Sequence, residues 1–114
     1  MNNIEKGKLG EDIASRYIIS KGGRIIEKNY RTKIGEIDLI VKINNQLVFV
    51  EVKSRNSLNY GYPCEAVNYK KQRKIINVAK YYILNNSLEN TPIRFDVIEI
   101  YLKDKKINHL KNAF

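Results

Sequence analysis

Apolar and polar residues alternate along two consecutive segments, residues 36–43 and 46–53, and this period of two predicts a pair of β-strands. The segments are joined by Asn44-Asn45, a dipeptide that tolerates positive φ and favours a tight hairpin turn. A two-residue turn fixes the register, because each residue then pairs with the one equally distant from the turn on the other arm. A four-residue loop centred on the same dipeptide gives the same register.

In this register Asp38 lies opposite Glu51, and Glu36 lies opposite Lys53. Directly opposed residues have Cβ atoms roughly 5 Å apart and project to the same face of the sheet. The polar ends of the two arms therefore coincide. The other face is apolar, and we expect it to carry Ile37, Leu39 and Val41 from the first arm and Val48, Val50 and Val52 from the second.

Helical spacing of apolar residues predicts two helices outside the hairpin, and shorter apolar runs predict three more strands. These elements are expected at residues 4–21 (helix), 24–30 (strand), 65–85 (helix), 93–102 (strand) and 107–110 (strand). Turn-forming residues predict a loop over 54–64. The order α-β-β-β-α-β-β indicates an α/β fold, in which a mixed β-sheet is flanked by two main helices. We expect residues 1–114 to form a single domain.

The first predicted helix has two glycines on or beside its apolar side, Gly7 and Gly10. Each costs roughly 1 kcal/mol of helix propensity relative to alanine. Close approach to another backbone is one reason to tolerate such residues. Glu11 flanks the buried face of this helix, and it can join the polar strand ends if the helix packs beside them.

Charge is unevenly distributed, with 21 Lys and Arg against 12 Asp and Glu and a formal net charge of +9. Such an excess favours a polyanionic partner, most simply nucleic acid, although a solubilising lysine-rich surface is the alternative. No apolar run is long enough to span a membrane, and the first residues lack the apolar core of a signal peptide. The single cysteine, Cys64, suits a reducing compartment, and we expect a cytoplasmic protein.

The residue types favour a metal held by oxygen atoms. With one cysteine and one histidine in the chain, a zinc site of sulfur and nitrogen ligands is disfavoured, and the hairpin carboxylates suit Mg²⁺ or Mn²⁺. A cation between Asp38 and Glu51 polarises a phosphate and lowers the pKa of an attacking water, while Lys53 orients that water or stabilises the developing charge. The alternative is a Glu36–Lys53 salt bridge beside two solvated carboxylates.

An Asp on one strand followed by Glu-x-Lys on the next resembles the PD-(D/E)xK nuclease superfamily. The whole chain is similar to the YraN-type bacterial family, which in turn resembles archaeal Holliday junction resolvases. The matching stretches are residues 7–14, 35–40, 48–53, 71–74, 94–97 and 112–114. The leading proline of the superfamily motif is replaced by Ile37.

This resemblance implies a restriction-endonuclease-like core with Asp38, Glu51 and Lys53 at its centre. It also implies that Glu11 fills the acidic position of the first helix and that Gln72 lies beside the site. The metal ligands are then Asp38 and Glu51, with the Val52 carbonyl as a third ligand and Glu11 bound through water.

Basic residues at the start of the second predicted helix favour contacts with a nucleic-acid backbone, which position a strand without reading its sequence. The expected nucleic-acid-binding residues are Arg55, Lys70, Lys71, Gln72, Arg73 and Lys74. A solvated basic face is the alternative for this group.

Four other positions admit more than one interpretation. Residues 60–63 are either a base-stacking loop or an ordinary aromatic one, with the second favoured. Asp96 either supports the site or forms a structural ion pair, and we favour the ion pair. Cys64 has no neighbouring base that would make it a nucleophile. We expect His109 to be a surface residue.

Two functions follow from these patterns. The first is a metal-dependent, structure-selective DNA endonuclease, for which the resemblance favours branched DNA. Symmetric cleavage of a junction needs two sites and hence a homodimer. The alternative is a non-catalytic nucleic-acid-binding module that retains the nuclease fold for its basic surface.

Overall fold

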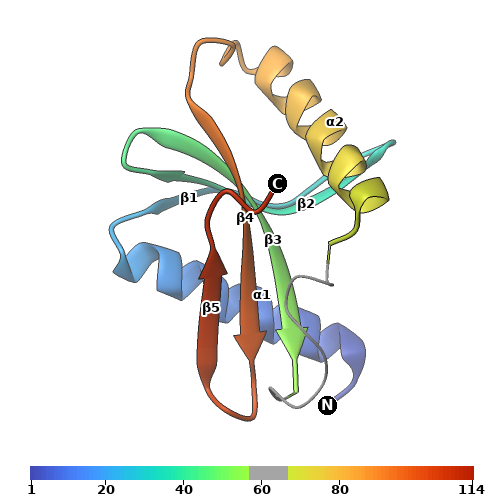
Figure 1. Cartoon of the computed structure of the whole chain (residues 1–114), viewed down its shortest axis with the longest axis vertical. Helices are drawn as coiled ribbons and strands as arrows, with labels where there is room; N and C mark the ends of the chain where they lie inside the picture. Colours follow the sequence, from blue (N-terminus) through green and yellow to red (C-terminus); the bar gives the residue numbers. More distant parts are fainter. Residues whose placement is uncertain (57–66) are drawn as a thin grey trace.

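A mixed β-sheet with a helix on each face forms the centre of the structure (Figure 1). This computed structural model describes residues 1–56 and 67–114. Its elements are α1 (Asn3–Ser20), β1 (Arg24–Thr32), β2 (Gly35–Ile43), β3 (Gln46–Arg55), α2 (Tyr69–Asn85), β4 (Ile93–Tyr101) and β5 (Lys106–Leu110). The strands lie in the order β1-β2-β3-β4-β5. The predicted α-β-β-β-α-β-β arrangement is therefore confirmed.

Two boundaries differ from the predictions around the 54–64 loop. Strand β3 runs on to Arg55 because β4 continues to pair with it, as far as Arg55–Tyr101. Helix α2 begins at Tyr69 rather than at residue 65, because the Asn68 side chain accepts a hydrogen bond from the backbone N–H of Lys71 (2.9 Å) and caps the helix there. The predictions for residues 60–63 and Cys64 lie outside the described residues.

The hairpin forms with the predicted two-residue turn. Asn44 and Asn45 both have positive φ, at 48° and 65°, which asparagine adopts more readily than most residues. The ladder runs from Ile43–Gln46 to Leu39–Val50, so the register predicted from the turn is confirmed over these pairs.

The third and fourth strands pair in parallel, with Glu51 beside Val97 and Lys53 beside Glu99. Helix α2 supplies the crossover that a parallel pair requires. Strand β5 then returns antiparallel to β4 and ends the sheet. In the described part of the chain, no helix has the length and apolar character needed to cross a membrane.

Each helix covers its own apolar core. Helix α1 packs on one face through Ala14 and Ile18, and α2 packs on the other through residues that include Val78 and Tyr82. The strand residues buried under α1 are Leu39, Val41, Val48, Val50, Ile98 and Ile100. Those buried under α2 are Ile37, Ile40, Leu47, Phe49 and Val97.

The predicted face of Ile37 is wrong. It is buried under α2 together with Ile40, not under α1 together with Leu39. Two residues three positions apart share a face only if the alternation is broken between them. The break occurs where β2 stops pairing with β3 but continues along β1, through Tyr30–Ile37 to Thr32–Gly35.

Asp96 anchors the end of the chain to the sheet. Its carboxylate is fully buried, accepts two hydrogen bonds from Arg94 (2.9 Å each), and contacts Nε2 of His109 (2.7 Å) and the backbone N–H of Asn112 (3.1 Å). Burial alone would raise the pKa of Asp96, but the hydrogen bonds from His109, Arg94 and Asn112 outweigh it and lower that pKa. Asp96 is thus a structural ion pair, the favoured interpretation.

The prediction that His109 is a surface residue is wrong. Its side chain is only 8% exposed, because Nε2 contacts Asp96 and Nδ1 lies 3.0 Å from the Tyr17 hydroxyl on α1. The sequence shows a histidine near the chain end, but it does not show that α1 passes beside β5 at this point.

The two glycines of α1 differ in their surroundings. A Cβ added to Gly10 would overlap the Ser54 side chain of β3, whereas a Cβ added to Gly7 would meet nothing within 4 Å. Close approach to another backbone, the expected reason for these glycines, is therefore not found: Gly10 approaches a side chain, and Gly7 approaches nothing.

We expect Gly7→Ala to raise the free energy of unfolding by about 0.5–1 kcal/mol, because alanine favours the helix and no atom obstructs it. Gly10→Ala should lower it by about 1–3 kcal/mol, because the Ser54 side chain must rotate and α1 must shift to admit the methyl group. Urea denaturation of both variants measures the difference. Equal stability of the two variants would contradict the close contact between α1 and β3.

Candidate active site

The candidate site lies where β2 and β3 separate, a divergence that Figure 1 shows near the middle of the sheet. The ladder ends at Leu39–Val50, so Asp38 and Glu51 are not the backbone pair that the register predicted. Instead, the Asp38 carboxylate accepts a hydrogen bond from the backbone N–H of Val52 (2.8 Å). A side-chain oxygen thus takes the place of the main-chain acceptor that β2 would otherwise supply.

The separation leaves a groove of about 360 Å³ between the first turns of α1 and the freed edge of β3. Predicted site residues from three elements line it: Glu11, Asp38, Glu51, Val52 and Lys53. The groove is also lined by Asn3, Lys6, Gly7, Ser54 and Lys71. The structure therefore brings all four predicted catalytic side chains to one place, although the strands meet differently from the prediction.

Glu51 is the most strongly perturbed carboxyl of the groove. Its side chain is 7% exposed, and burial, a hydrogen bond with Asp38 and the negative charge of Asp38 together raise the pKa of Glu51 to about 9. The positive charges of Lys71 and Lys53 oppose this shift but do not cancel it. At neutral pH and without a cation, Glu51 therefore keeps its proton.

Two lysines face this carboxylate pair. Lys71 Nζ of α2 lies 3.9 Å from Glu51 Oε2. Burial, followed by a hydrogen bond with Lys71 and the charge of that neighbour, lowers the pKa of Lys53. The acidic groups Glu51 and Asp38 act in the opposite direction. Lys53 and Lys71 therefore lie close enough for the charge of Lys71 to disfavour the protonated form of Lys53.

Glu11 approaches from α1 and is held by β1. Burial raises the pKa of Glu11, and the negative charges of Asp38 and Glu36 raise it further. A hydrogen bond from the Asn29 side chain and the charge of Arg31 act against that rise. Asn29 has φ of 52°, so the strand departs from extended geometry at this residue.

The Glu36–Lys53 salt bridge, the alternative interpretation, does not form. Glu36 pairs with Arg31 across the β1–β2 ladder, with Nε and Oε1 3.4 Å apart. Both side chains are substantially exposed, so this pair contributes little to stability. The reason is the same divergence. Residues 35–37 of β2 pair with β1, whereas the β2–β3 ladder ends at Leu39–Val50.

The donor set suits a hard divalent cation. The carboxylates of Asp38 and Glu51 are oxygen ligands of the kind that Mg²⁺ prefers, and a cation would replace the proton that Glu51 holds. In the described part of the chain, however, no three His, Cys, Asp or Glu residues come close enough to chelate a metal. Glu11 is therefore placed to act from a greater distance than Asp38 and Glu51.

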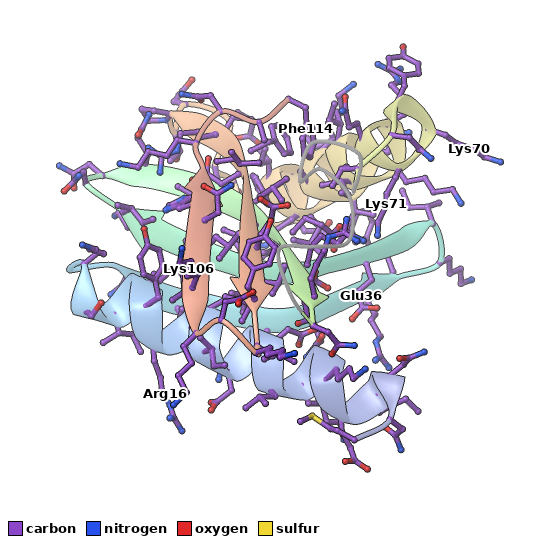
Figure 2. All side chains as sticks on the ribbon, turned by 60° about the horizontal axis from the view of Figure 1, so that its bottom comes forward. Arg16, Glu36, Lys70, Lys71, Lys106 and Phe114 are labelled. Carbon is purple, nitrogen blue, oxygen red and sulfur yellow. The ribbon has the colours of Figure 1, made fainter. Side chains whose placement is uncertain are left out.

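The predicted nucleic-acid-binding residues divide into two groups. Lys70, Arg73 and Lys74 are exposed on α2, and Figure 2 shows Lys70 extending outward from the start of this helix. Lys74 and Lys71 also line a second hollow of about 210 Å³, which borders Asp38 and Glu51.

The other two predicted residues point elsewhere. The Gln72 amide donates to the Val67 carbonyl (3.1 Å) and faces a different cavity. Arg55 lies beside Tyr101 in the β3–β4 ladder, and its Nε is buried without a hydrogen-bond partner among residues 1–56 and 67–114. Arg55 is therefore less available to a nucleic acid than the residues of α2.

Sequence reasoning missed several groove residues. Asn3 and Gly7 precede Glu11 by two helical turns and one turn, so the spacing of α1 could have identified them. Asn29 is different. An asparagine within an otherwise apolar and charged strand is a sign of unusual backbone, but no local pattern connects it to Glu11.

These features define a small basic α/β protein with a groove between two diverging strands, lined by carboxylates and lysines. The chain belongs to the family described as "Uncharacterised protein family UPF0102", the YraN family, whose profile matches residues 10–100. The resemblance to YraN-type proteins is therefore confirmed.

The chain is similar over its whole length to curated members of this family. A UPF0102 protein of Clostridioides difficile is 62% identical over 114 residues, with both chains covered completely. One from Caldanaerobacter subterraneus is 48% identical, with 100% of this chain and 98% of the relative covered. One from Thermodesulfovibrio yellowstonii is 51% identical, with 100% and 99% covered.

Among solved structures, the chain is weakly similar to one described as "The structure of Pyrococcus Furiosus SfsA in complex with Ca2+". The TM-score is 0.40 and the identity 18%, with 96% of this chain and 64% of that chain covered. A likeness of this extent transfers neither fold nor activity.

Burial of Glu51 makes stability depend on pH. The folded pKa of Glu51, about 9, lies above the ordinary value of 4.5. Its contribution to stability is therefore fully present below pH 4.5 and is lost as the pH rises toward 9. In metal-free buffer we expect Glu51→Gln to be more stable than the parent at about pH 8, by roughly 1–3 kcal/mol. The difference should shrink toward zero near pH 4. Denaturation at a series of pH values measures it.

Glu89→Gln is the matched control, because the Glu89 carboxyl is exposed between α2 and β4. This control should not reproduce the pH-dependent gain. A Glu51→Gln variant that is less stable than the parent at every pH would show that the two carboxyls do not repel each other.

Proposed function

We propose that this protein is a metal-dependent DNA endonuclease that hydrolyses phosphodiester bonds, with branched DNA as its favoured substrate. The observation that carries the proposal is the meeting of Asp38 and Glu51 in one groove beside Lys53. Burying the Glu51 carboxyl beside Asp38 is costly to a fold, and the hydrogen bond from Val52 to Asp38 does not explain why Glu51 lies there. A site that binds a cation does explain it.

We assign the cation, Mg²⁺ or Mn²⁺, to the carboxylates of Asp38 and Glu51. The Val52 carbonyl is the third oxygen, and Glu11 contributes through a water molecule. Bound there, the cation would polarise the phosphate and acidify a water. Magnesium usually retains several waters, so two direct carboxylates are a sufficient set.

The protein side chains supply the remaining roles. Lys53 is placed to orient the attacking water or to stabilise the charge that develops on the phosphate. Lys71 opposes the negative charge of Glu51 at 3.9 Å and is placed to contact a phosphate oxygen. Asn29 holds Glu11 in place through a hydrogen bond.

Nucleic acid as the partner is supported by charge. The chain carries a formal net charge of +9, and Lys70, Arg73 and Lys74 are exposed on the helix that borders the site. Such residues hold a phosphate backbone near the groove without reading its sequence. The preference for branched DNA, and the homodimer that symmetric cutting requires, rest on the resemblance to junction resolvases.

One observation favours the alternative of a non-catalytic nucleic-acid-binding module. Within the described ranges, the groove does not hold three carboxylates close enough to chelate a metal by themselves. On the endonuclease hypothesis, a phosphate of the substrate and the Val52 carbonyl complete the ligand set. On the module hypothesis, the groove never holds a metal.

Cleavage tests the two hypotheses directly. We expect the purified protein to cut at least one of branched, single-stranded and linear duplex DNA when Mg²⁺ or Mn²⁺ is present, and none when the metal is chelated. Asp38→Asn and Lys53→Ala should each reduce the cutting rate by about a hundredfold or more, while DNA binding survives. Gel assays of cutting and binding on the same substrates provide both measurements.

If no substrate is cut under any of these conditions, the module hypothesis is favoured. In that case Asp38→Asn should leave DNA binding unchanged or slightly stronger, because one negative charge is removed.

The basic residues of α2 lead to a separate prediction about DNA binding. Lys70→Ala and Arg73→Ala should each weaken DNA binding on all sequences and lower the slope of log affinity against log salt by about 1. Lys106→Ala, on an exposed strand away from the groove, is the matched control and should change neither quantity (Figure 2). Fluorescence anisotropy over a range of salt concentrations measures both. Equal losses from Lys70 and Lys106 would indicate a diffuse charge effect rather than a binding face.

A further inference from the structure

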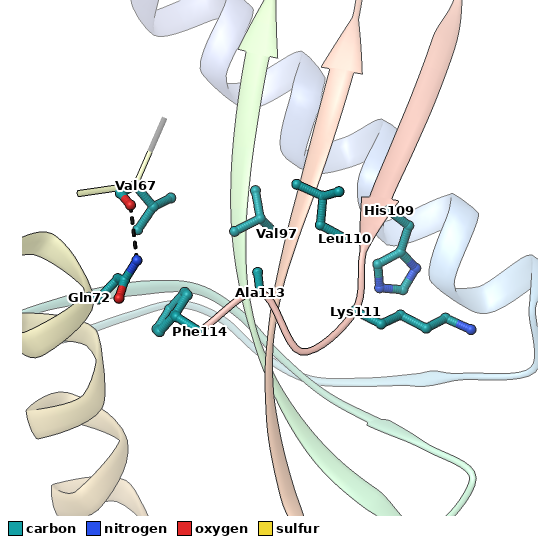
Figure 3. Close-up of a pocket in the computed structure, with 8 residues that line it drawn as sticks. All are labelled: Val67, Gln72, Val97, His109, Leu110, Lys111, Ala113 and Phe114. Carbon is teal, nitrogen blue, oxygen red and sulfur yellow. Dashed lines mark hydrogen bonds between the residues drawn. The ribbon is translucent and has the colours of Figure 1, made fainter. Parts of the chain in front are cut away.

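A cavity of about 400 Å³ lies beside the candidate site, on the face of the sheet that carries α2 (Figure 3). Its floor includes Val97 of β4 and Leu110 of β5, and its sides include Val67, Gln72 and Phe114. The volume falls within the range of small-ligand sites, roughly 300–1,000 Å³. None of the roles assigned to the groove uses this cavity.

One wall of the cavity is the end of an aromatic stack. Phe49 stacks on Phe95, with ring centroids 5.4 Å apart, and Phe95 stacks on Phe114, with centroids 5.2 Å apart. The interplanar angles are 25° and 28°, so the three rings are nearly parallel. Phe114, the last ring of this stack, also lines the cavity, where it can meet a further flat ring.

The end of the chain is held firmly enough to present this ring. The backbone N–H of Ala113 donates to the Phe95 carbonyl (2.7 Å), and that of Asn112 donates to buried Asp96 (3.1 Å). The residues on either side of the stack are thus attached to β4. A ring fixed in this way loses little conformational freedom when a ligand binds.

The cavity and the candidate metal position lie over neighbouring strands of the sheet. Val97 pairs with Glu51 across the β3–β4 ladder, where neighbouring strands are about 4.8 Å apart. Val97 and Glu51 form one pair of this ladder, so their side chains project to the same face of the sheet. A phosphate held at Asp38 and Glu51 therefore leaves its own base within reach of the cavity.

A polar group is available for the edge of a base. The Gln72 side-chain nitrogen donates to the Val67 carbonyl, the bond drawn in Figure 3. The side-chain oxygen of Gln72 receives no hydrogen bond from any residue in the described part of the chain. Lys111 lines the opposite side of the cavity, with its ammonium directed away from Phe114 (Figure 3).

We infer that this cavity binds an unpaired nucleobase of the DNA strand whose phosphate lies in the groove, with the base stacked on Phe114 and its edge facing Gln72. The inference rests on the proposed function for the position of that phosphate. It deepens that function by naming the substrate class: a strand whose base at the reacting phosphate is single-stranded or extruded from the duplex. Stacking on an aromatic ring accepts any base, so the cavity selects unpaired structure rather than sequence.

The test measures binding alone, in the full-length Asp38→Asn protein, which retains its site but should not cut. Two fluorescently labelled probes are compared by anisotropy: a short oligodeoxyadenylate, and a base-free oligomer of the same length with tetrahydrofuran in place of each nucleoside. We expect about tenfold tighter binding of the base-bearing probe. Phe114→Leu should remove most of this preference while leaving the affinity for the base-free probe unchanged.

Two further variants make the result specific. Gln72→Ala, on the helix surface, should reduce the preference without disturbing the aromatic stack, so it tests the cavity even if Phe114→Leu unfolds. Tyr81→Leu removes an exposed aromatic ring from α2 outside the cavity and should keep the full preference. Thermal melting of each variant establishes that it is folded.

Equal binding of the two probes by the Asp38→Asn parent would overturn the inference. So would a preference that survives both Phe114→Leu and Gln72→Ala, or one that Tyr81→Leu abolishes instead. Failure of the proposed function is distinguishable, because a protein that cuts no DNA can still show the base preference. If the protein cuts DNA but shows no such preference, the proposed function stands and the inference about this cavity fails.

Discussion

The hydrogen bond from the Val52 N–H to the Asp38 carboxylate is the contact on which the site depends. Two antiparallel strands separate only if the main-chain groups that lose each other find other partners, since an unsatisfied buried N–H is costly. Here one carboxylate oxygen satisfies the freed N–H. Beyond this point β2 follows β1, Ile37 turns under α2, and the edge of β3 opens into the groove. A single side chain therefore ends the ladder and also provides a site ligand.

The price of this arrangement is electrostatic. The buried Glu51 lies beside the half-buried Asp38, and the pKa of Glu51 rises to about 9 as a result. The surrounding hydrophobic packing holds them there, because the cores on both faces of the sheet fix β2 and β3 independently of the charges. Lys71 and Lys53 relieve the repulsion in part. A fold that tolerates such a pair is prepared for a cation in a way that a relaxed pair of surface carboxylates is not.

On the other side of β3, the buried Asp96 network has a different purpose. Its charge is fully compensated by Arg94 and by contacts with His109 and the backbone of Asn112, so it stabilises the end of the chain rather than reacting. By fixing this end against β4, it completes the Phe49–Phe95–Phe114 stack next to the groove. The stretches 94–97 and 112–114, which are distant in sequence, are thus parts of one structural unit. Asp38 and Glu51, which repel each other, lie on β2 and β3, and Asp96, whose charge is compensated, lies on the adjoining β4. These environments account for their different roles.

The amino-acid sequence alone determined the order of elements, the two-residue turn at Asn44-Asn45 and the hairpin register from Ile43–Gln46 to Leu39–Val50. Periodicity and turn chemistry report which residues are neighbours along a strand or helix, and these contacts are local. Only the tertiary structure decided where β2 leaves β3, which face Ile37 takes, that Asn29 holds Glu11, that Lys71 lies at the carboxylates and that His109 is buried against Tyr17. Each of these depends on how twisted elements far apart in the chain pack together, and no local pattern records that packing.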